Sequence, residues 1–206
     1  WWENEGQRAL ANNSVAFKGK PEMGTFMREW TALYESKSGE RGIFNRQSAK
    51  VKASENGRRD DNYYFGCNPC SEIILRPYQF CNLTEVVARE TDNLDSLKDK
   101  VRMATILGTF QSTLTDFKYL RKVWKDNTEE ERLLGVSLTG ILDCPILNNN
   151  YYELADVLEE LKQVAIDTNK KVSKDLGIPQ STAITCIKPS GTVSQLVDSA
   201  SGIHAR

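Results

Sequence analysis

The sequence has no surplus of charge of either sign, because its 27 lysine and arginine residues nearly balance its 28 aspartate and glutamate residues. Without a basic surplus, a nucleic-acid-binding protein that relies on phosphate contacts is disfavoured. The sequence also lacks a run of about 18 apolar residues, which excludes a transmembrane helix, and it shows no signal-peptide pattern. Hydrophobic residues make up 39% of the chain, which is enough for a core and excludes a disordered polyampholyte.

Histidine is nearly absent, and the five cysteines do not form two close pairs. The one histidine, His204, lies far from the cysteines of residues 67–81, so a cysteine–histidine nucleophile is not indicated. Residues 67–70 (Cys-Asn-Pro-Cys) have the spacing of half a zinc site, but such a site usually needs a second close pair. Five is an odd number for a disulfide scaffold, and we expect a reducing, cytoplasmic environment. Cys144 and Cys186 lie in apolar stretches and are interpreted as small buried residues.

The ends of the chain are unusual, since it starts with Trp1-Trp2 rather than Met and stops at His204-Ala205-Arg206 after a glycine-bearing turn. We therefore expect a piece of a longer chain, whose length and charge describe the piece only. Within it we predict no internal domain boundary, so residues 1–206 are interpreted as one partial domain.

Apolar residues at helical spacing predict several helices along the chain. Thr128 with Glu131 fits a capping box in front of an apolar run, and Gly177 with Pro179 fits the end of a helix. The predicted helices span residues 22–37, about 95–114, about 129–142 and 151–176.

Strand-like segments alternate with these helices, which favours an α/β fold with parallel strands. The charged residues of 47–62 are interpreted as a solvated loop or an exposed helix without functional weight. The predicted strands and buried extended segments lie at residues 42–46, 63–65, 81–88 and 182–187.

One constellation suited to chemistry is residues 68–72 (Asn-Pro-Cys-Ser-Glu), followed by Cys81. A thioredoxin-like cysteine pair would lie at the start of a helix, but Ile73-Ile74-Leu75 look like a strand. A carboxylate two residues after a cysteine, with another cysteine eleven residues on, suits redox or radical chemistry instead. In an extended segment residues i and i+2 point the same way, so Asn68, Cys70 and Glu72 are expected to face one substrate.

A second constellation, residues 188–194 (Lys-Pro-Ser-Gly-Thr-Val-Ser), follows a predicted strand. Glycine permits close approach of the backbone, and hydroxyl and amide groups can bind phosphate oxygens. The segment is not a Walker loop, because Gly-Lys-Ser/Thr is absent. Taken alone, the segment indicates an ordinary turn more than a phosphate site.

Together these motifs resemble the catalytic subunit of ribonucleotide reductases. The resemblance rests on Asn-Pro-Cys-Ser-Glu (68–72), Phe-Cys-Asn-Leu-Thr-Glu-Val (80–86) and Lys-Pro-Ser-Gly-Thr-Val-Ser (188–194). The Asn-Pro-Cys form resembles the adenosylcobalamin-dependent class, and the segment 80–86 resembles its monomeric ribonucleoside-triphosphate reductases. Further segments are similar to the family in the same order, and they span residues 39–46, 131–136 and 201–204.

The resemblance implies a ten-stranded α/β barrel, part of which residues 1–206 would form, with a central finger loop that carries the radical cysteine. It implies that Cys70 abstracts the ribose 3′ hydrogen, that Glu72 is the general base for the 3′-hydroxyl proton, and that Asn68 hydrogen-bonds the substrate hydroxyls. Cys81 matches one of the two cysteines that supply reducing equivalents, and no metal site is implied. The implied phosphate-binding loop consists of Pro189, Ser190, Gly191, Thr192, Val193 and Ser194.

The implied activity is allosterically controlled reduction of ribonucleotides, with the triphosphate favoured, to deoxyribonucleotides for DNA replication. Adenosylcobalamin is the implied cofactor, a thioredoxin-like protein the implied reductant, and a monomer the implied state. The partner of Cys81 and a C-terminal cysteine pair are missing, so the piece is expected to be inactive alone; Cys67 does not fit the pattern and is interpreted as structural. Two alternatives stay open: the large subunit of an iron-dependent ribonucleoside-diphosphate reductase, and a zinc-binding interaction module at Cys67 and Cys70.

Overall fold

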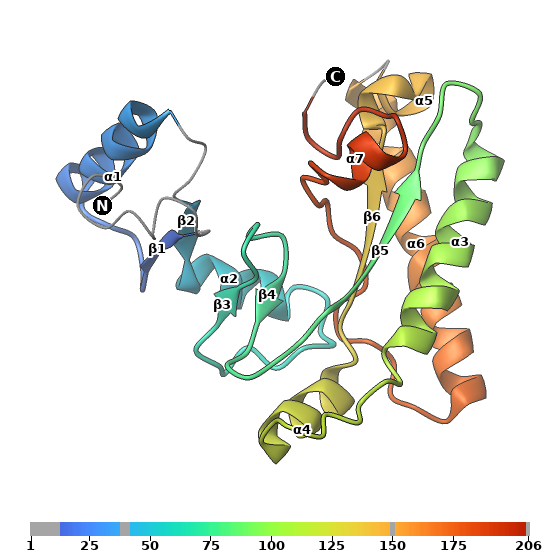
Figure 1. Ribbon diagram of the computed structural model, residues 1–206, viewed down its shortest axis with the longest axis horizontal. Helices are drawn as coiled ribbons and strands as arrows, with labels where there is room; N and C mark the ends of the chain where they lie inside the picture. Colours follow the sequence, from blue (N-terminus) through green and yellow to red (C-terminus); the bar gives the residue numbers. More distant parts are fainter. Residues whose placement is uncertain (1–12, 38–41, 149–150, 205–206) are drawn as a thin grey trace. The chain divides into compact units, whose positions relative to one another are not determined.

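The computed structural model describes residues 13–37, 42–148 and 151–204, whose secondary structure is shown in Figure 1. Both ends of the chain and residues 39–41 of one family-like segment lie outside the described residues. The chain divides into two compact units, the first ending at Pro77 and the second starting at Tyr78, and each has its own hydrophobic core. The interpretation of residues 1–206 as one partial barrel domain stays a prediction.

The first unit combines short strands with two helices. β1 and β2 pair in parallel, and β3 and β4 form an antiparallel hairpin. Its small core lies between α2 and the hairpin and contains Phe44, Ala49, Ala53 and Phe65. The elements in chain order are β1 Ser14–Phe17, α1 Met23–Ser36, β2 Gly42–Asn45, α2 Arg46–Ser54, β3 Gly66–Cys67 and β4 Ile74–Leu75.

The predictions for the first unit are confirmed for α1 and for the buried extended segment at β2, where Phe44 is buried. Asn45 ends β2 and caps α2, since its side chain accepts a hydrogen bond from the Ser48 amide at 3.0 Å. The interpretation of residues 47–62 as a solvated loop or an exposed helix agrees with α2, whose Lys50 and Lys52 are exposed. It is wrong at Arg59, whose side chain is buried against the hairpin.

The second unit is a parallel α/β arrangement, as the alternation of strands and helices predicted. β5 pairs in parallel with β6, and residues 182–187 run along the other edge of β6 through a parallel bridge between Val136 and Thr185. The helices α3 and α6 lie side by side against one face of this sheet (Figure 1). The elements are β5 Asn82–Val87, α3 Leu94–Gln111, α4 Lys122–Glu131, β6 Leu134–Thr139, η2 Ile141–Asp143, α5 Pro145–Asn148, α6 Tyr151–Leu176 and α7 Val193–Leu196.

The two faces of the β5–β6 sheet differ in chemistry because side chains alternate along a strand. Val86, Val136 and Leu138 point into the core formed with α3 and α6. Their neighbours Glu85, Ser137 and Thr139 therefore lie on the opposite face. The helices α3 and α6 therefore do not cover the polar face. Residues 188–190 contact this face through the Ser137 and Thr139 hydroxyls.

The helix predicted at residues 129–142 is wrong. α4 already ends at Glu131, Arg132 adopts a left-handed conformation with φ of 48°, and residues 134–139 form the fully buried strand β6. Thr128 lies inside α4, where its hydroxyl donates to the Trp124 carbonyl. A short apolar run has no periodicity that separates a buried strand from a buried helix, which is why the pattern misled.

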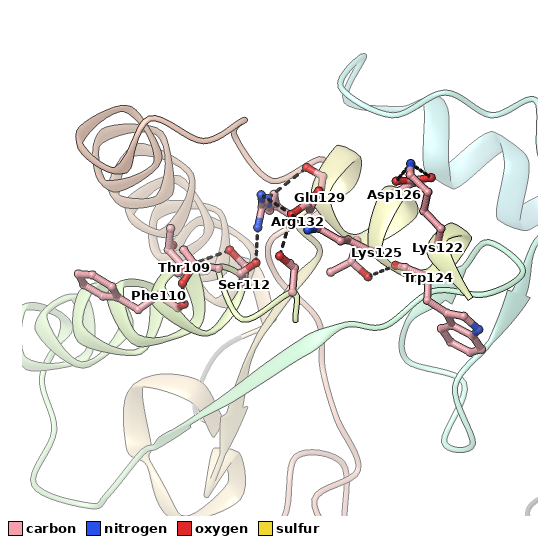
Figure 2. Close-up of polar contacts among 12 residues, drawn as sticks. Thr109, Phe110, Ser112, Lys122, Trp124, Lys125, Asp126, Glu129 and Arg132 are labelled. Atoms are coloured by element: carbon pink, nitrogen blue, oxygen red, sulfur yellow. Dashed lines mark hydrogen bonds and ion pairs between the residues drawn. The ribbon is translucent and has the colours of Figure 1, made fainter. Parts of the chain in front are cut away.

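The turn between α4 and β6 is closed by Arg132, whose guanidinium lies between Ser112 and Glu129 in Figure 2. It donates to the Ser112 carbonyl at 2.6 Å and to the Glu129 carbonyl at 3.1 Å. Two carbonyl groups at chain turns are thereby satisfied in a buried place. The family-like segment 131–136 thus has a clear structural role in starting β6.

The other two predicted helices of this unit are confirmed. Asn93 and Ser96 form a capping box at the start of α3. At the end of α6, Gly177 has φ of 66° and the Ile178 amide donates to the Ser173 carbonyl, which is a Schellman-type ending. None of the helices in the described ranges combines the length and hydropathy required to cross a bilayer.

Candidate active site

Residues 68–72 form the tip of the β3–β4 hairpin. The Ser71 amide donates to the Asn68 carbonyl at 3.0 Å, which closes a turn with Pro69 and Cys70 at its centre. Proline at the second position of such a turn is favoured because its φ is already fixed. Ser71 has φ of 64°, so the chain reverses there and the Asn68 amide meets the Ile73 carbonyl at 3.2 Å.

The extended conformation assumed for residues 68–72 is therefore wrong. Strand alternation does not apply in a turn, so it no longer provides a reason for Asn68, Cys70 and Glu72 to share a face. Cys70 is exposed at the tip, and Glu72 is half-buried on the returning side. Their contact with one common substrate stays a prediction that rests on the family motif.

Asn68 also has a structural role in the hairpin tip. Its side-chain oxygen accepts a hydrogen bond from the Ile73 amide at 3.0 Å, while its NH₂ group is a donor by chemistry. Cys67 packs against the core of the first unit, and its sulfur lies 3.4 Å from the Ser71 hydroxyl oxygen. The cysteines of residues 67–70 are both thiols, and no group of three or more metal-ligating side chains occurs within the described residues.

Three arginines stabilise this hairpin, and we refer to Arg46, Arg59 and Arg76 as the arginine brace. Arg46 donates to the Phe65 carbonyl, and Arg59 donates to the Ile74 carbonyl at 2.9 Å. Each arginine also lies over an aromatic ring at 3.7–4.9 Å from its centroid, a cation–π geometry. The brace ties both strands of the hairpin to the body of the first unit.

In the second unit, Cys81 immediately precedes β5 and is half-buried. The Asn82 side chain that follows it donates to the Leu133 carbonyl at 3.0 Å and so ties the start of β5 to the start of β6. By strand alternation, Cys81 and Glu85 lie on the same, polar face of the sheet.

The candidate phosphate loop, residues 189–194, follows the extended segment 182–187 and leads into α7. Ser190 and Ser194 are buried, and their hydroxyls point back into the protein. The Ser190 hydroxyl lies 2.6 Å from that of Thr139, and Ser194 donates to the Gly191 carbonyl at 3.2 Å. Gly191 and Thr192 are exposed at the crest of the loop.

The amide groups of residues 191–193 donate no hydrogen bond to any described part of the chain. Three consecutive backbone amides without an acceptor among the described residues are donors that an anion can use. A methyl group at Gly191 would meet no atom within 4 Å, so the space over this backbone is open. The loop can therefore bind phosphate through its backbone, while the serine hydroxyls shape it from below.

Two glycines hold the loop against the carboxyl ends of the strands. A Cβ atom at Gly202 would lie 1.9 Å from the Lys188 carbonyl oxygen, and the Gly202 amide donates to the Pro189 carbonyl. Gly140, at the end of β6, has φ of 75°, and a Cβ there would lie 2.3 Å from the Ala88 oxygen. Both contacts are backbone to backbone, which only glycine permits.

Arg89, just beyond β5, fixes the chain that follows α7. Its guanidinium donates to the carbonyls of Val197 and Asp198. His204, near the end of the described chain, lies with its Nδ1 atom 3.1 Å from the Ser201 hydroxyl, away from any thiol contact in the structure. It thus belongs to the turn at residues 201–204 rather than to a nucleophilic pair.

Glu85 is a candidate residue that sequence reasoning missed, although it lies in the quoted segment 80–86. Burial raises the pKa of the Glu85 carboxyl, and this outweighs the opposing effects of the Ser190 hydroxyl and the Lys188 ammonium group. The signal in the sequence is a charged residue inside a strand of otherwise uncharged residues. The role of Glu85 depends on which side chains surround its carboxyl, and only the tertiary structure shows them.

The described fold resembles part of a ribonucleotide reductase. A solved structure described as a B12-dependent, class II ribonucleotide reductase aligns with 66% of this chain and 22% of its own, with a TM-score of 0.55 and 22% identity. The parallel α/β arrangement agrees with this likeness, and the complete ten-stranded barrel stays an expectation.

The sequence relatives narrow this class. The chain is related to the adenosylcobalamin-dependent ribonucleoside-triphosphate reductases, which confirms the resemblance seen in its motifs. The enzyme of Euglena gracilis is 29% identical over 81% of this chain, and that of Lacticaseibacillus paracasei is 29% identical over 96%. The chain spans only 23% and 29% of the length of these two relatives. No family model matches the chain.

Proposed function

We propose that the chain is the part of an adenosylcobalamin-dependent ribonucleoside-triphosphate reductase that carries the radical cysteine and the substrate-phosphate loop. The observation that carries the proposal is the exposed Cys70 at a braced hairpin tip, within a motif that matches the family finger loop. The relatives named above support the type of reaction and the cofactor.

In this function Cys70, as a thiyl radical, abstracts the 3′ hydrogen of the ribose and becomes a thiol again. Glu72 takes the proton of the 3′-hydroxyl as a general base, and the Asn68 amide hydrogen-bonds the substrate hydroxyls. The Asn68 oxygen is already bonded to the Ile73 amide, so we assign the substrate contact to its NH₂ group. The 2′-hydroxyl then leaves as water with a proton from one of the reducing thiols. Once the two thiols have reduced C2′, Cys70 returns a hydrogen atom to C3′ and becomes a thiyl radical again, and Glu72 gives its proton back to the 3′-oxygen.

Cys81 supplies reducing equivalents for this step together with a second cysteine, and the two thiols become a disulfide as the substrate is reduced. A thioredoxin-like protein restores the thiols by thiol–disulfide exchange. Half-burial of Cys81 on the polar face of the sheet suits this role, because a reacting thiol needs access from one side and shielding on the other.

Adenosylcobalamin, when bound, supplies the radical that oxidises a cysteine thiol. A thiol oxidised in this way must be accessible to the cofactor. The Cys70 thiol meets this requirement, because it is exposed at the tip of the hairpin and a bulky group can approach it. The hairpin's own contribution is to hold the thiol in place through the turn at residues 68–71 and the arginine brace.

The phosphates of the substrate bind to the loop of residues 189–194. The amides of Gly191, Thr192 and Val193 are the donors, and the Thr192 hydroxyl adds a further one at the exposed crest. Binding the charged tail of the nucleotide restricts the orientation of the ribose, which lowers the entropy cost of the reaction.

The test is Cys70→Ser in the intact protein, assayed for deoxynucleotide formation with adenosylcobalamin and a dithiol. We expect the activity to fall to background, while Cys67→Ser in the same hairpin keeps most of it. Retained activity in Cys70→Ser refutes the proposal. Activity that needs a second protein subunit and no cobalamin would instead favour the iron-dependent class, and zinc lost with both cysteines would favour an interaction module.

A further inference from the structure

Glu85 occupies the middle of β5 directly beneath the candidate phosphate loop. It pairs in register with Ser137 of β6, and both lie on the polar face of the sheet, opposite the core with α3 and α6. The hydroxyls of Ser190, Thr139 and Ser137 each act to lower the pKa of its carboxyl, although burial raises it overall. A carboxylate this close to a phosphate-binding loop is unexpected, because two anions repel each other.

Two hydroxyl groups link this carboxyl to the loop. The Ser137 hydroxyl accepts a hydrogen bond from the Lys188 amide at 2.8 Å, so its own proton can point to Glu85. The Thr139 and Ser190 hydroxyls lie 2.6 Å apart and form one hydrogen bond, in which either hydroxyl can be the donor. The charge on Glu85 therefore decides which way these hydroxyls donate, since a carboxylate only accepts and a carboxyl also donates.

The residues around Glu85 do not supply hydrogen bonds to all the oxygen atoms of an ionised carboxylate. Its Oε1 atom is buried and accepts no hydrogen bond of ordinary geometry from the described residues. The Lys188 ammonium group is the one charged group of the described chain that acts on it; Lys100 of α3 is bonded to Asp92 and to the Val87 carbonyl instead. β6 contributes only hydroxyls to its environment.

We propose that Glu85 is a positioning residue that takes up one proton from solvent when a triphosphate binds to residues 189–194. The neutral carboxyl removes the repulsion between the two anions and donates into the Thr139–Ser190 pair, which holds Ser190 in its left-handed conformation beneath the loop. The proton returns to solvent when the nucleotide leaves. This inference rests on the proposed phosphate-binding function of the loop.

The test measures proton uptake in the intact protein by titration calorimetry with CTP in two buffers of different ionisation enthalpy. We expect Glu85→Gln to take up fewer protons per bound CTP than the wild type, by as much as one. Glu90→Gln, an exposed glutamate just beyond the same strand, should match the wild type. Equal proton uptake in Glu85→Gln and the wild type overturns the inference.

The same coupling predicts the pH dependence of affinity. The wild-type Kd for CTP should rise with pH relative to that of Glu85→Gln, by up to about tenfold per pH unit for one linked proton. The titration of the nucleotide itself cancels in this comparison. Superimposable pH profiles overturn the inference.

Two further measurements separate the possible failures. In the wild type itself, infrared difference spectra should show a protonated carboxyl band on CTP binding, which does not depend on the variant's folding; absence of this band overturns the inference. Gly191→Ala should raise the Kd for CTP about tenfold, because its methyl group occupies the open space over the loop. If Gly191→Ala leaves the Kd unchanged, the proposed phosphate role of the loop is refuted, and the role of Glu85 is refuted with it. If Gly191→Ala raises the Kd but Glu85→Gln takes up as many protons as the wild type, only the role of Glu85 is refuted.

Discussion

The hairpin tip of the first unit and the phosphate loop of the second are both turns with a residue at positive φ, yet they are stabilised differently. Around Cys70, side chains add to the backbone hydrogen bonds of the turn: the Asn68 oxygen binds the Ile73 amide, and the arginine brace binds the hairpin strands. Around Ser190, it is held by backbone contacts that need glycine and by hydroxyls pointing inward. Long side chains fix the support of the hairpin while the Cys70 thiol stays exposed, whereas close backbone contacts leave the amides of residues 191–193 without an acceptor among the described residues.

The largest effect is expected at the backbone contacts of the second unit. Gly202→Ala forces a Cβ atom to within 1.9 Å of the Lys188 oxygen, so the backbone must move. We expect a loss of about 3 kcal/mol in the free energy of unfolding, in the upper range for overpacked sites. Urea denaturation measures it, with Gly191→Ala, which meets no atom within 4 Å, as the matched control. Equal stability of the two variants would contradict the importance of this contact.

An intermediate effect is expected for the arginine brace. Arg59→Ala removes the hydrogen bond to the Ile74 carbonyl and the contact with Phe65, which we expect to cost about 2 kcal/mol. In kinetics, kcat should fall while KM for the nucleotide stays nearly constant, because the hairpin tip is displaced and the loop is not. Lys52→Ala, an exposed residue of α2, is the control. A change in KM alone would contradict the assignment of the brace to the hairpin.

The smallest effect is expected at Asp92, which joins the end of β5 to α3. Burial alone would raise its pKa, but hydrogen bonds from Lys100, Ser96 and the Arg89 amide outweigh burial and lower it. A lowered pKa stabilises the fold above the ordinary carboxyl range, and this contribution disappears as pH falls through the lowered value.

Asp92→Asn should therefore cost about 1 kcal/mol near neutral pH and nothing in strong acid. Thermal unfolding of wild type and variant at several pH values measures this, and Asp116→Asn, an exposed residue, is the control. The arginine brace contains no carboxylate, so the effect of Arg59→Ala should not follow the same pH curve. Parallel pH curves for both variants would remove this distinction between the two units.

Much of the second unit could be predicted from the sequence because its signals are local. The capping box at Asn93 and the glycine after α6 mark helix ends by chemistry within a few residues. β6 could not be predicted, because a fully buried strand and a buried helix segment present the same apolar run. The turn at residues 68–72 was missed for a related reason: its conformation depends on the pairing of β3 with β4.

The sequence motifs identified the candidate residues, but they did not predict the structural environment of each side chain. The motif of residues 188–194 predicted that hydroxyl and amide groups bind phosphate. The structure turns the Ser190 and Ser194 hydroxyls inward and leaves the amides of 191–193 without an acceptor among the described residues. Arg59 seemed one of many solvated charges, and it is buried against Phe65.

The sequence by itself determined the kinship with the adenosylcobalamin-dependent reductases, the parallel α/β class and the identity of the candidate residues, because motif order and periodicity are properties of the chain. Only the tertiary structure decided that Cys70 stands on a turn, that Lys188 and Gly202 meet through their backbones, and that Glu85 lies beneath Ser190. These facts depend on contacts between residues far apart in the chain. Burial and charge at such contacts are set by neighbours that no local pattern specifies.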